Sequence, residues 1–506
     1  MNNNFIQTDN KNTELEYDGL DSYFHQFREN LIGNNLEFHT VFGKKNICYA
    51  DWTASGRLYA PIEEKISREI GPYLANTHTE TNLTGKTMTL AYHSAQEIIK
   101  KHVGARSSDK ILLAGSGMTG AMSKFMRIIG IKVPDKLKEY TKIEKNEKPV
   151  VFISHMEHHS NQTMWEESLA DVVIIKHKSL GEIDLDDLRE KLREHKDRKY
   201  KYASVTACSN VTGIQTPYYE IAEIMHAWGG KCFVDFACSA PYVSINMHPE
   251  NSAQKIDAIF ISPHKFLGGP GSVGVCVFCD SIYDNDVPDD PAGGTVKWTN
   301  PWGGHSYFDE IETREDGGTP PFLQTIKAAY AVMLKDKMTS EKLLEREHYI
   351  RNLVFEHFDK IPNLRLLAND FRDRMCVFSF YIDELHYNLA VRILNDRYGV
   401  QVRGGCSCAG TYGHIIFDID EDYSCQITSK IDNGDNSEKV GWIRMSFHPV
   451  NSNEEILHCL NSVKELAENF HAWENDYSYD THSDSFVHKL DNGLEEKVSA
   501  GWFSDV

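Results

Sequence analysis

Blocks of apolar residues separated by polar turns run along most of the chain. Several short runs are β-branched or aromatic and end in polar residues, as at 149–154, 202–208 and 231–234, and stretches with apolar residues at helical spacing lie between them, as at 183–195 and 221–228. Strands that alternate with helices in this way build a mostly parallel sheet with helices on its faces. The pattern predicts an α/β fold.

Further elements are expected on both sides of this region. Helical spacing predicts helices over 21–31, 61–70, 91–103 and 383–397, short apolar runs predict strands over 46–52, 111–114, 172–176, 273–278 and 400–403, and 73–85 is expected to be a loop. Near the end, the alternation in 442–448 (WIRMSFH) places Arg444 and Ile443 on opposite faces of a strand. Ser452 with Glu455 predicts a capping box at the start of a final helix.

Polar side chains follow four of the predicted strands directly. These are His158, Asn210, Asp235 and Lys265. Ligands of parallel α/β sheets bind at the carboxyl ends of the strands, so we expect the four side chains to meet in one crevice. Three of them also have an ordinary alternative. His158 could belong to a metal cluster with His155, His159 and Glu157. Asn210 could be a turn residue, and Asp235 could cap a helix.

Lys265 lies in the stretch 257–274, where an uncharged strand ends at Pro263. Ser262 and His264 are donors on either side of Pro263, and glycines follow the lysine. A lysine in such a turn suits a Schiff base with a carbonyl cofactor. The alternative for a single lysine is a solvated loop residue.

A glycine-rich turn, GSGMTG, gives a second signal for a ligand. It follows the strand at 111–114 and opens a helix near Thr119. Free N–H groups at a helix N-terminus bind anions, and hydroxyl groups strengthen such a site. Gly117, Met118 and Thr119 are therefore candidate phosphate ligands.

These groups together fit one cofactor, pyridoxal 5'-phosphate. Lys265 would form the Schiff base, and Asp235 would keep the pyridine nitrogen protonated so that the ring acts as an electron sink. A buried carboxylate needs such a cation beside it. An imidazole, for which His158 is the candidate, would stack on the ring.

Composition and charge narrow the class of protein. The chain has 506 residues, of which 41% are hydrophobic and 25% charged, and its formal net charge is −21 at pH 7. This charge argues against a nucleic-acid partner and against an anionic membrane surface. The first residues lack a signal-peptide pattern, no apolar run approaches membrane-spanning length, and eleven scattered cysteines show no disulfide framework. We expect a cytoplasmic protein with reduced thiols.

Two further motifs are set aside because of their positions. Gly269, Gly271 and Gly274 match G-x-G-x-x-G, yet they precede a predicted strand instead of opening a helix, which excludes a dinucleotide fingerprint. Cys276 and Cys279 match C-x-x-C, but residues three apart in a strand face opposite sides. We expect both cysteines in the core and no metal site.

Several of these stretches together resemble one family, the class V aminotransferase-like enzymes, and within it the cysteine desulfurase and selenocysteine lyase group. The stretch 262–265 (SPHK) is similar to the group's S-G-H-K, and 157–161 (EHHSN) to its E-H-H-(A/S)-N. Two more motifs match at 117–120 and 235–237. The resemblance spans about residues 49–470. It implies the pyridoxal-phosphate-dependent transferase fold (fold type I), with pyridoxal 5'-phosphate as cofactor and a homodimer.

The resemblance also implies roles for residues of the last third. Cys408 matches the nucleophile that a mobile loop carries to the substrate sulfur, and Arg403 matches an arginine ahead of that loop. Arg444 matches the arginine that clamps the substrate α-carboxylate, a bidentate contact that lysine makes less well. His158 would shuttle protons. His78 is a candidate wall of the substrate site, with a satisfied loop histidine as the alternative.

Three features depart from the group's pattern. Cys238 stands where desulfurases have a glutamine near the phenolic oxygen of the cofactor, and Cys406 has no counterpart. Additional segments lie at 284–316, 412–440 and 475–506. The segment at 412–440 follows the cysteine loop directly, where it would cover the cleft or restrict sulfur acceptors.

The resemblance implies removal of sulfur from L-cysteine or a related amino acid, through a Lys265 Schiff base and a Cys408 persulfide, with alanine as product. A sulfur-acceptor protein would then take the sulfur. Two alternatives stay open. One is another reaction on the same fold, as a C–S lyase (β-elimination), an aminotransferase or an epimerase, with Cys408 incidental; the other is a non-catalytic sulfur-relay or scaffold subunit.

We expect four parts along the chain. They are a polar N-terminal extension over 1–45, a large cofactor-binding domain over 60–310, a smaller α+β domain formed by 46–59 and 330–470 that carries the cysteine loop and the substrate arginine, and an acidic tail over 475–506.

Overall fold

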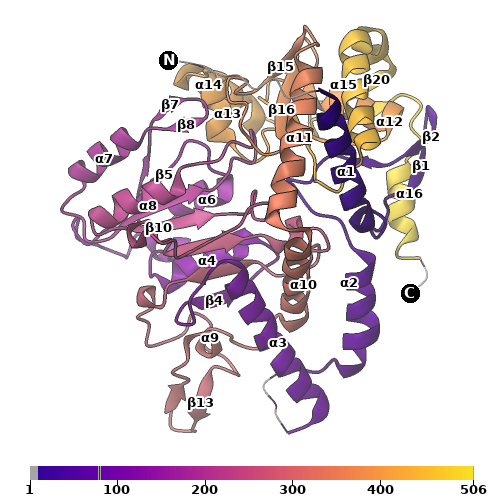
Figure 1. Ribbon diagram of the computed structural model, residues 1–506. Coiled ribbons are helices and arrows are strands. Elements are labelled where there is room, and N and C mark those ends of the chain that lie inside the picture. Colours follow the sequence, from indigo (N-terminus) through magenta and orange to yellow (C-terminus); the bar gives the residue numbers. More distant parts are fainter. Residues whose placement is uncertain (1–9, 78, 80, 505–506) are drawn as a thin grey trace.

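A seven-stranded sheet forms the centre of the larger part of the molecule (Figure 1). In the computed structural model, which describes residues 10–77, 79 and 81–504, its order is β4 (Lys110–Leu113), β12 (Val275–Phe278), β11 (Ala258–Ile261), β10 (Lys231–Asp235), β9 (Lys201–Thr206), β5 (Val150–Ile153) and β6 (Asp171–Ile174). Strand β12 pairs antiparallel with both neighbours, and the other pairs are parallel. The mostly parallel sheet predicted from the sequence is confirmed.

Helices cover both faces of this sheet, which is why its inner strands are apolar along their whole length. One face packs against α3 (Leu83–His102), α7 (Leu185–Glu194), α8 (Tyr218–Ala227) and α10 (Phe322–Met338), and the other against α4 (Met118–Ile128) and α6 (His159–Glu166). Phe125 of α4, for example, lies edge-on to Phe233 and Phe260, with ring centroids 5.1 and 5.5 Å apart. Buried parallel strands read as continuous apolar runs for this reason.

A second, four-stranded sheet carries the smaller hydrophobic core. Its order is β15 (Leu364–Leu366), β16 (Val377–Ile382), β19 (Trp442–Ser446) and β18 (Arg403–Gly405), and all three pairings are antiparallel. Helices α11 (Ser340–Phe358), α12 (Tyr387–Tyr398) and α15 (Asn453–Trp473) contribute to this core. The predicted capping box of Ser452 and Glu455 is present at the start of α15.

A strand from the beginning of the chain completes the smaller core. Strand β3 (Cys48–Tyr49) pairs in parallel with β17 (Val400–Gln401), and Ser446 N donates to Ala50 O at 2.8 Å. Residues about 350 to 400 positions apart in the sequence therefore lie side by side. This connection brings the segment after β3 toward the larger sheet.

Several expected boundaries are displaced. The expected loop at 73–85 ends early because the Asn82 side chain accepts from Gly85 N and starts α3 at Leu83. The first helix, α1, covers Asn10–Arg28 instead of 21–31, and residues 1–9 of the expected extension lie outside the described residues. The expected helix at 61–70 is α2 (Ala60–Glu64) followed by a π-helical stretch, Lys65–Ile70.

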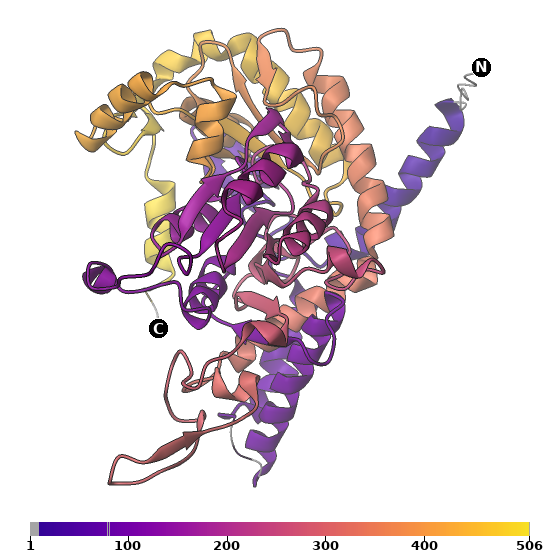
Figure 2. The ribbon, with the colours of Figure 1, turned by 90° about the vertical axis from the view of Figure 1, so that its left-hand side faces the viewer.

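The additional segments form structure of their own. Within 284–316, β13 (Val296–Thr299) and β14 (His305–Tyr307) make a hairpin that projects from the molecule (Figure 2). The segment after the cysteine loop holds α13 (Gly410–Ile416) and α14 (Glu421–Asp432), and the tail holds β20 (Tyr477–Asp480), β21 (Ser485–His488) and α16 (Leu494–Gly501). Shorter elements are β1 (Glu37–Thr40), β2 (Gly43–Asn46), α5 (Asp135–Lys138), β7 (His177–Ser179), β8 (Glu182–Ile183) and α9 (Ile311–Arg314).

Within the described part of the chain, no helix has both the length and the apolar character needed to cross a bilayer.

Candidate active site

One cavity of about 220 Å³ collects almost every residue that the sequence singled out for ligand binding. It is lined by Gly117, Met118, Thr119, His158, Asn210, Asp235, Ser262, His264, Lys265, Arg403, Cys408 and Arg444. The first nine come from the carboxyl edge of the large sheet and the last three from the smaller sheet and its loop. His78 lies outside the described residues.

Lys265 ends a short 3₁₀ turn, Pro263–Lys265, which follows β11 directly. The turn is held by close backbone approaches: Gly56 N donates to His264 O at 2.9 Å, and a Cβ atom at Gly269 would lie 1.8 Å from Pro263 O. Burial lowers the pKa of the Lys265 amine, against the opposing charges of Cys238 and Asp235. A larger fraction of the Lys265 amine is therefore in the neutral form, which is the nucleophilic form.

Asp235 is the last residue of β10, and it is buried. Its carboxylate accepts from Ala237 N at 2.8 Å, yet burial raises the pKa of this group to about 6. A cation placed in the cavity beside this carboxylate would reverse the rise. The protonated nitrogen of a pyridine ring is such a cation, so the site fits the cofactor at this point.

His158 precedes α6, and its ring is fixed by the helix that it caps. The Nδ1 atom accepts from Ser160 N at 3.1 Å, which leaves the proton of the neutral ring on Nε2. Burial, together with the nearby Lys265, lowers the pKa of His158 to about 3. His158 is therefore a neutral imidazole at ordinary pH.

The other members of the suspected histidine cluster turn toward different partners. His155 Nε2 lies 3.1 Å from Leu180 O, and His159 Nε2 accepts from Gly410 N at 2.9 Å. Glu157 accepts from Thr206 N at 3.0 Å. These contacts separate the side chains, so the arrangement does not support the alternative of a metal held by this cluster.

The glycine-rich turn opens α4, with Gly117 as the residue before the helix. Met118 N donates to Ser262 Oγ at 2.9 Å, and Thr119 Oγ1 lies 2.7 Å from Ser160 Oγ. A Cβ atom at Gly117 would approach both Ser262 and His264 to 3.3 Å. The helix N-terminus and these hydroxyls fit the phosphate of the cofactor.

The loop that carries Cys408 is short and is held in place. Asn210 Nδ2 donates to Ser407 O at 2.7 Å, His159 N donates to Cys408 O at 2.8 Å, and Trp442 Nε1 donates to Ser407 Oγ at 3.2 Å. The Cys408 thiol remains exposed. Only residues 406–409 separate β18 from α13, so the segment that would carry the sulfur is short.

Backbone strain accompanies the exposed thiol. Ser407 and Cys408 have φ angles of +52° and +57°, in the left-handed region that residues with a Cβ rarely occupy. Such conformations persist where the surrounding contacts determine them. Asn210, which lines the cavity and is expected to contact the cofactor, is one of the residues that make these contacts.

Two arginines share one carboxylate at the mouth of the cavity. Arg444 Nη2 lies 2.8 Å from Asp51 Oδ1, and Arg403 Nε lies 3.1 Å from Asp51 Oδ2. Arg444 is buried and its Nε has no hydrogen-bond partner, whereas the Arg403 side chain is 47% exposed. The Nε–H group of Arg444 can thus donate to an oxygen of a carboxylate ligand.

Sequence reasoning missed Asp51. Its side chain follows β3 from the opposite end of the chain, and its distance from Arg444 in sequence hides the pairing. The available signal was a single acidic residue after a short apolar run (NICYADW). The same rule that selected Asp235 would have selected Asp51.

Cys238 has a second thiol beside it. The sulfur atoms of Cys238 and Cys208 both lie 3.7 Å from Ser209 O, and both residues line the cavity. A hydrogen bond from Cys208, with Lys265 and Arg444 nearby, lowers the pKa of the Cys238 thiol. Cys238 therefore places a thiol of lowered pKa beside Lys265, at the position where the related desulfurases have an amide.

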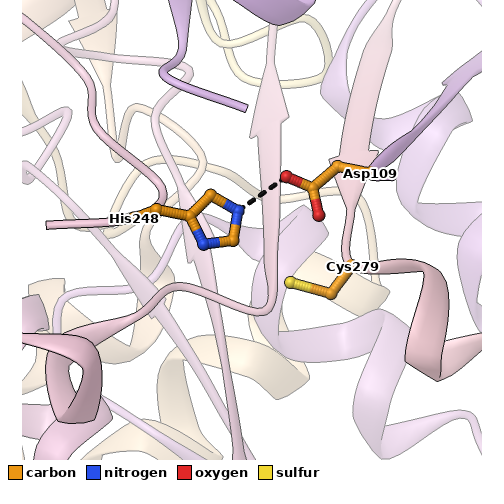
Figure 3. A group of neighbouring side chains, drawn as sticks. All are labelled: Asp109, His248 and Cys279. Atoms are coloured by element: carbon orange, nitrogen blue, oxygen red, sulfur yellow. Dashed lines mark hydrogen bonds and ion pairs between the residues drawn. The ribbon is translucent and has the colours of Figure 1, made fainter. Parts of the chain in front are cut away.

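A separate group of possible metal ligands lies at the other edge of the large sheet. Asp109, His248 and Cys279 come together there, with Asp109 before β4 and Cys279 after β12 (Figure 3). His248 Nε2 is only 2.6 Å from Asp109 Oδ2. Two ligands of one tetrahedral ion at about 2.1 Å stand about 3.4 Å apart, so this contact is a direct hydrogen bond and we assign it no metal.

Comparisons with known proteins agree with this geometry. The model of the class-V aminotransferase family matches residues 48–458. A probable cysteine desulfurase of Halalkalibacterium halodurans is 24% identical over 367 residues, 72% of this chain and 84% of that protein. One of Staphylococcus epidermidis is 25% identical over 372 residues, again 72% and 84%.

Solved structures show the same fold. A cysteine desulfurase of Thermococcus onnurineus matches with a TM-score of 0.69 at 21% identity, over 88% of this chain and 98% of that one. A cysteine desulfurase of Escherichia coli matches with a TM-score of 0.64 at 19% identity, over 83% and 94%. The chain therefore belongs to the class V aminotransferase family and has the fold of its pyridoxal-phosphate-dependent enzymes.

Proposed function

We propose that this protein is a pyridoxal-phosphate-dependent cysteine desulfurase. It takes sulfur from L-cysteine or a closely related amino acid, holds the sulfur on Cys408 as a persulfide and releases alanine. One observation carries the proposal, which is that the exposed Cys408 thiol lines the same cavity as Lys265 and Arg444. The printed names of the relatives, probable cysteine desulfurases, support it.

The residues that would hold the cofactor are those of the large sheet. Lys265 would bind it covalently, Asp235 would face its ring nitrogen, His158 would face the ring, and the turn at 117–119 with Ser262 would face its phosphate. When bound, pyridoxal 5'-phosphate supplies a carbonyl carbon for an amine and a ring that withdraws electrons from the substrate Cα.

Substrate orientation falls to the two arginines. We propose that the substrate α-carboxylate binds Arg444 as a bidentate partner and displaces part of the Asp51 contact. The buried Nε of Arg444, which has no partner, gains one in this way. Arg403, which is closer to solvent, contributes charge at the entrance of the cavity.

Proton transfer is the task of Lys265 and His158. Burial favours the neutral form of both groups, so the Lys265 amine can accept a proton inside the cavity, whereas neutral His158 already holds one on Nε2. We assign removal of the Cα proton to the Lys265 amine, and the return of a proton to Cβ of the product to His158. His158 Nε2 carries the hydrogen that faces away from its Nδ1 contact with Ser160.

The sulfur step belongs to Cys408. Its thiolate attacks the substrate sulfur, so that an S–S bond forms as the Cβ–S bond breaks, and Cβ takes up the proton that completes alanine. Hydrogen bonds to the backbone of residues 407–408 orient the thiol toward the cavity without covering it. Because this loop is short, we propose that an acceptor protein comes to the persulfide.

We also propose how the parts of the protein divide this work. The part at 60–310 binds the cofactor, and the part formed by 46–59 and 330–470 supplies the arginines and the thiol. A homodimer is supported by an apolar groove of about 370 Å³ between the π-helical stretch, α3 and α10, beside the exposed Leu83 and Leu90. The chain has eleven cysteines, and none of them forms a disulfide in the described structure. We propose a cytoplasmic location, which this absence of disulfides suits.

The experiment that tests the function is product analysis with L-cysteine. We expect alanine together with enzyme-bound sulfur, and mass spectrometry of the protein after brief exposure to cysteine should find one added sulfur on the peptide that contains Cys408. Pyruvate and ammonia without added sulfur would instead identify a β-eliminating C–S lyase. An absence of any cofactor absorbance near 410–430 nm would identify a non-catalytic subunit.

A further inference from the structure

Two cysteines outside the active site lie in direct contact. Cys48 on β3 and Cys459 on α15 place their sulfur atoms 3.3 Å apart, although they are 411 positions apart in the sequence. Both are buried in the smaller core, and Cys48 also donates weakly to Glu455 O at 3.6 Å. A disulfide needs a sulfur–sulfur distance of about 2.0 Å, so an approach of about 1.3 Å would complete the bond.

Cys48 is accessible from one side. With 5% of its surface exposed, it is one of the residues that line an open cleft of about 840 Å³ between the N-terminal segment and the smaller core. Arg28, Lys44, Arg397 and His458 line this cleft together with acidic residues. Cys459, with no exposed surface, lies behind Cys48. A small uncharged molecule in the cleft therefore meets the Cys48 sulfur first.

Hydrogen bonding gives the two thiols different roles, one as donor and one as acceptor. The Cys48 thiol is directed to Glu455 O, so the Cys459 hydrogen is the one that lies between the two sulfur atoms. This hydrogen bond, with burial, raises the pKa of Cys459 well above its ordinary value. A donor of this kind makes the accepting sulfur the first site of reaction with an electrophile.

We propose that Cys48 and Cys459 form an oxidisable dithiol that closes to a disulfide in the folded protein when a hydroperoxide enters the cleft. The Cys48 sulfur attacks the peroxide O–O bond and becomes a sulfenic acid, and one water leaves. The Cys459 thiol then attacks that sulfur, the S–O bond breaks, and a second water leaves. The two thiols lose two electrons and two protons in all, and the hydrogen peroxide is reduced to two waters.

The position of the pair connects it to the active site. Strand β3 continues into Ala50, whose carbonyl accepts from Ser446 N, and then into Asp51, which holds Arg444. A bond from Cys48 to α15 would fix this strand against the smaller core. Formation of the bond does not depend on the proposed desulfurase activity, because neither cysteine lines the catalytic cavity.

Peptide mapping after oxidation tests the proposal. The folded full-length protein is treated with hydrogen peroxide, blocked with iodoacetamide, and digested with trypsin without reduction. Cleavage after Lys45, Arg57, Arg444 and Lys464 gives one peptide for each cysteine, 46–57 and 445–464. We expect these two peptides joined and lighter by two hydrogens than their sum, and separated again by dithiothreitol.

Matched variants exclude chance pairing. Cys459→Ser should leave Cys48 as a sulfenic acid that dimedone labels, whereas Cys276→Ser, which removes an isolated buried thiol, should form the link like the wild type. Oxidation in denaturant should instead give disulfides between many different pairs of cysteines. The proposal is overturned if the native protein shows oxidised peptides for the exposed Cys408 and Cys425 while 46–57 and 445–464 stay reduced and unlinked.

Discussion

The two sides of the catalytic cavity are built in opposite ways. Asp235 is buried at the end of β10, and Lys265 is half-buried in the turn after β11. Desolvation favours the neutral form of both groups, because it raises the pKa of Asp235 and lowers the pKa of Lys265. Cys408 is exposed, lies on a left-handed backbone and is oriented by hydrogen bonds to its main chain. The difference indicates that the chemistry at Cα depends on desolvation, whereas transfer of sulfur depends on access. The following substitutions separate these two requirements.

The largest effect is expected from Lys265→Ala. The variant should lose covalently bound cofactor, because no other lysine lines the cavity in the described structure, and kcat should fall by about 10⁴-fold or more. Borohydride reduction followed by mass spectrometry measures the covalent bond. Lys327→Ala, which removes a lysine paired with Glu63 outside the cavity, is the control and should keep the bond. Retention of a reducible bond in the first variant would contradict the assignment.

Cys408→Ser should affect the transfer of sulfur and leave the binding of the cofactor unchanged. We expect normal cofactor absorbance and a loss of alanine formation of about 10³-fold, since a hydroxyl is a poor nucleophile toward sulfur. Cys425→Ser, which changes an exposed thiol on α14, and Cys406→Ser should each retain most of the activity. Unchanged alanine production by Cys408→Ser would remove the thiol from the mechanism.

Asp235→Asn tests desolvation through stability. The folded pKa of Asp235 without cofactor is about 6, above the ordinary 3.8, so the ionised carboxylate destabilises the folded state as pH rises through about 6. The difference between these two pKa values lowers the free energy of unfolding by about 3 kcal/mol above pH 7 and leaves it unchanged below pH 4. Cofactor-free Asp235→Asn should therefore melt at a higher temperature than the wild type at pH 8 and at the same temperature at pH 4. With cofactor bound, the order at pH 8 should reverse.

Arg444→Lys compares the buried arginine with the exposed one. The substitution loses bidentate contact to the substrate carboxylate, and we expect KM to rise about tenfold, equivalent to about 1.4 kcal/mol, with unchanged cofactor absorbance. Arg403→Lys should raise KM by much less, because its side chain is half exposed. Equal effects of the two substitutions would show that both arginines bind the carboxylate.

The smallest effect is expected from Asn210→Ala. It removes the 2.7 Å hydrogen bond to Ser407 O, worth about 1 kcal/mol, and so loosens the strained segment. The rate at which iodoacetamide alkylates Cys408 should change by about fivefold, while cofactor binding stays the same. A weakened affinity for the cofactor would return Asn210 to the role expected from the sequence.

The alternating pattern predicted the large sheet and its ligand edge because the rule connecting strand ends to ligands is local. His158, Asp235 and Lys265 follow their strands directly, so the sequence alone indicates that they meet. The contact between Asp51 and Arg444 escaped prediction because Arg444 lies on β19, 393 positions away, and no local pattern encodes that pairing. The fixed position of Cys408 likewise depends on Asn210, a contact across 197 residues between the two parts of the molecule.

The register of β18 and β19 has a consequence for ligand binding and strand pairing together. Arg403 lies directly opposite Arg444 in this antiparallel pair, an arrangement in which like charges repel. Asp51 bridges the two and offsets the repulsion. Any carboxylate that binds both arginines must by linkage also stabilise the pairing of these strands, so amide hydrogens of β18 and β19 should exchange more slowly when an amino acid is bound. Binding of the substrate and pairing of β18 with β19 are therefore thermodynamically linked.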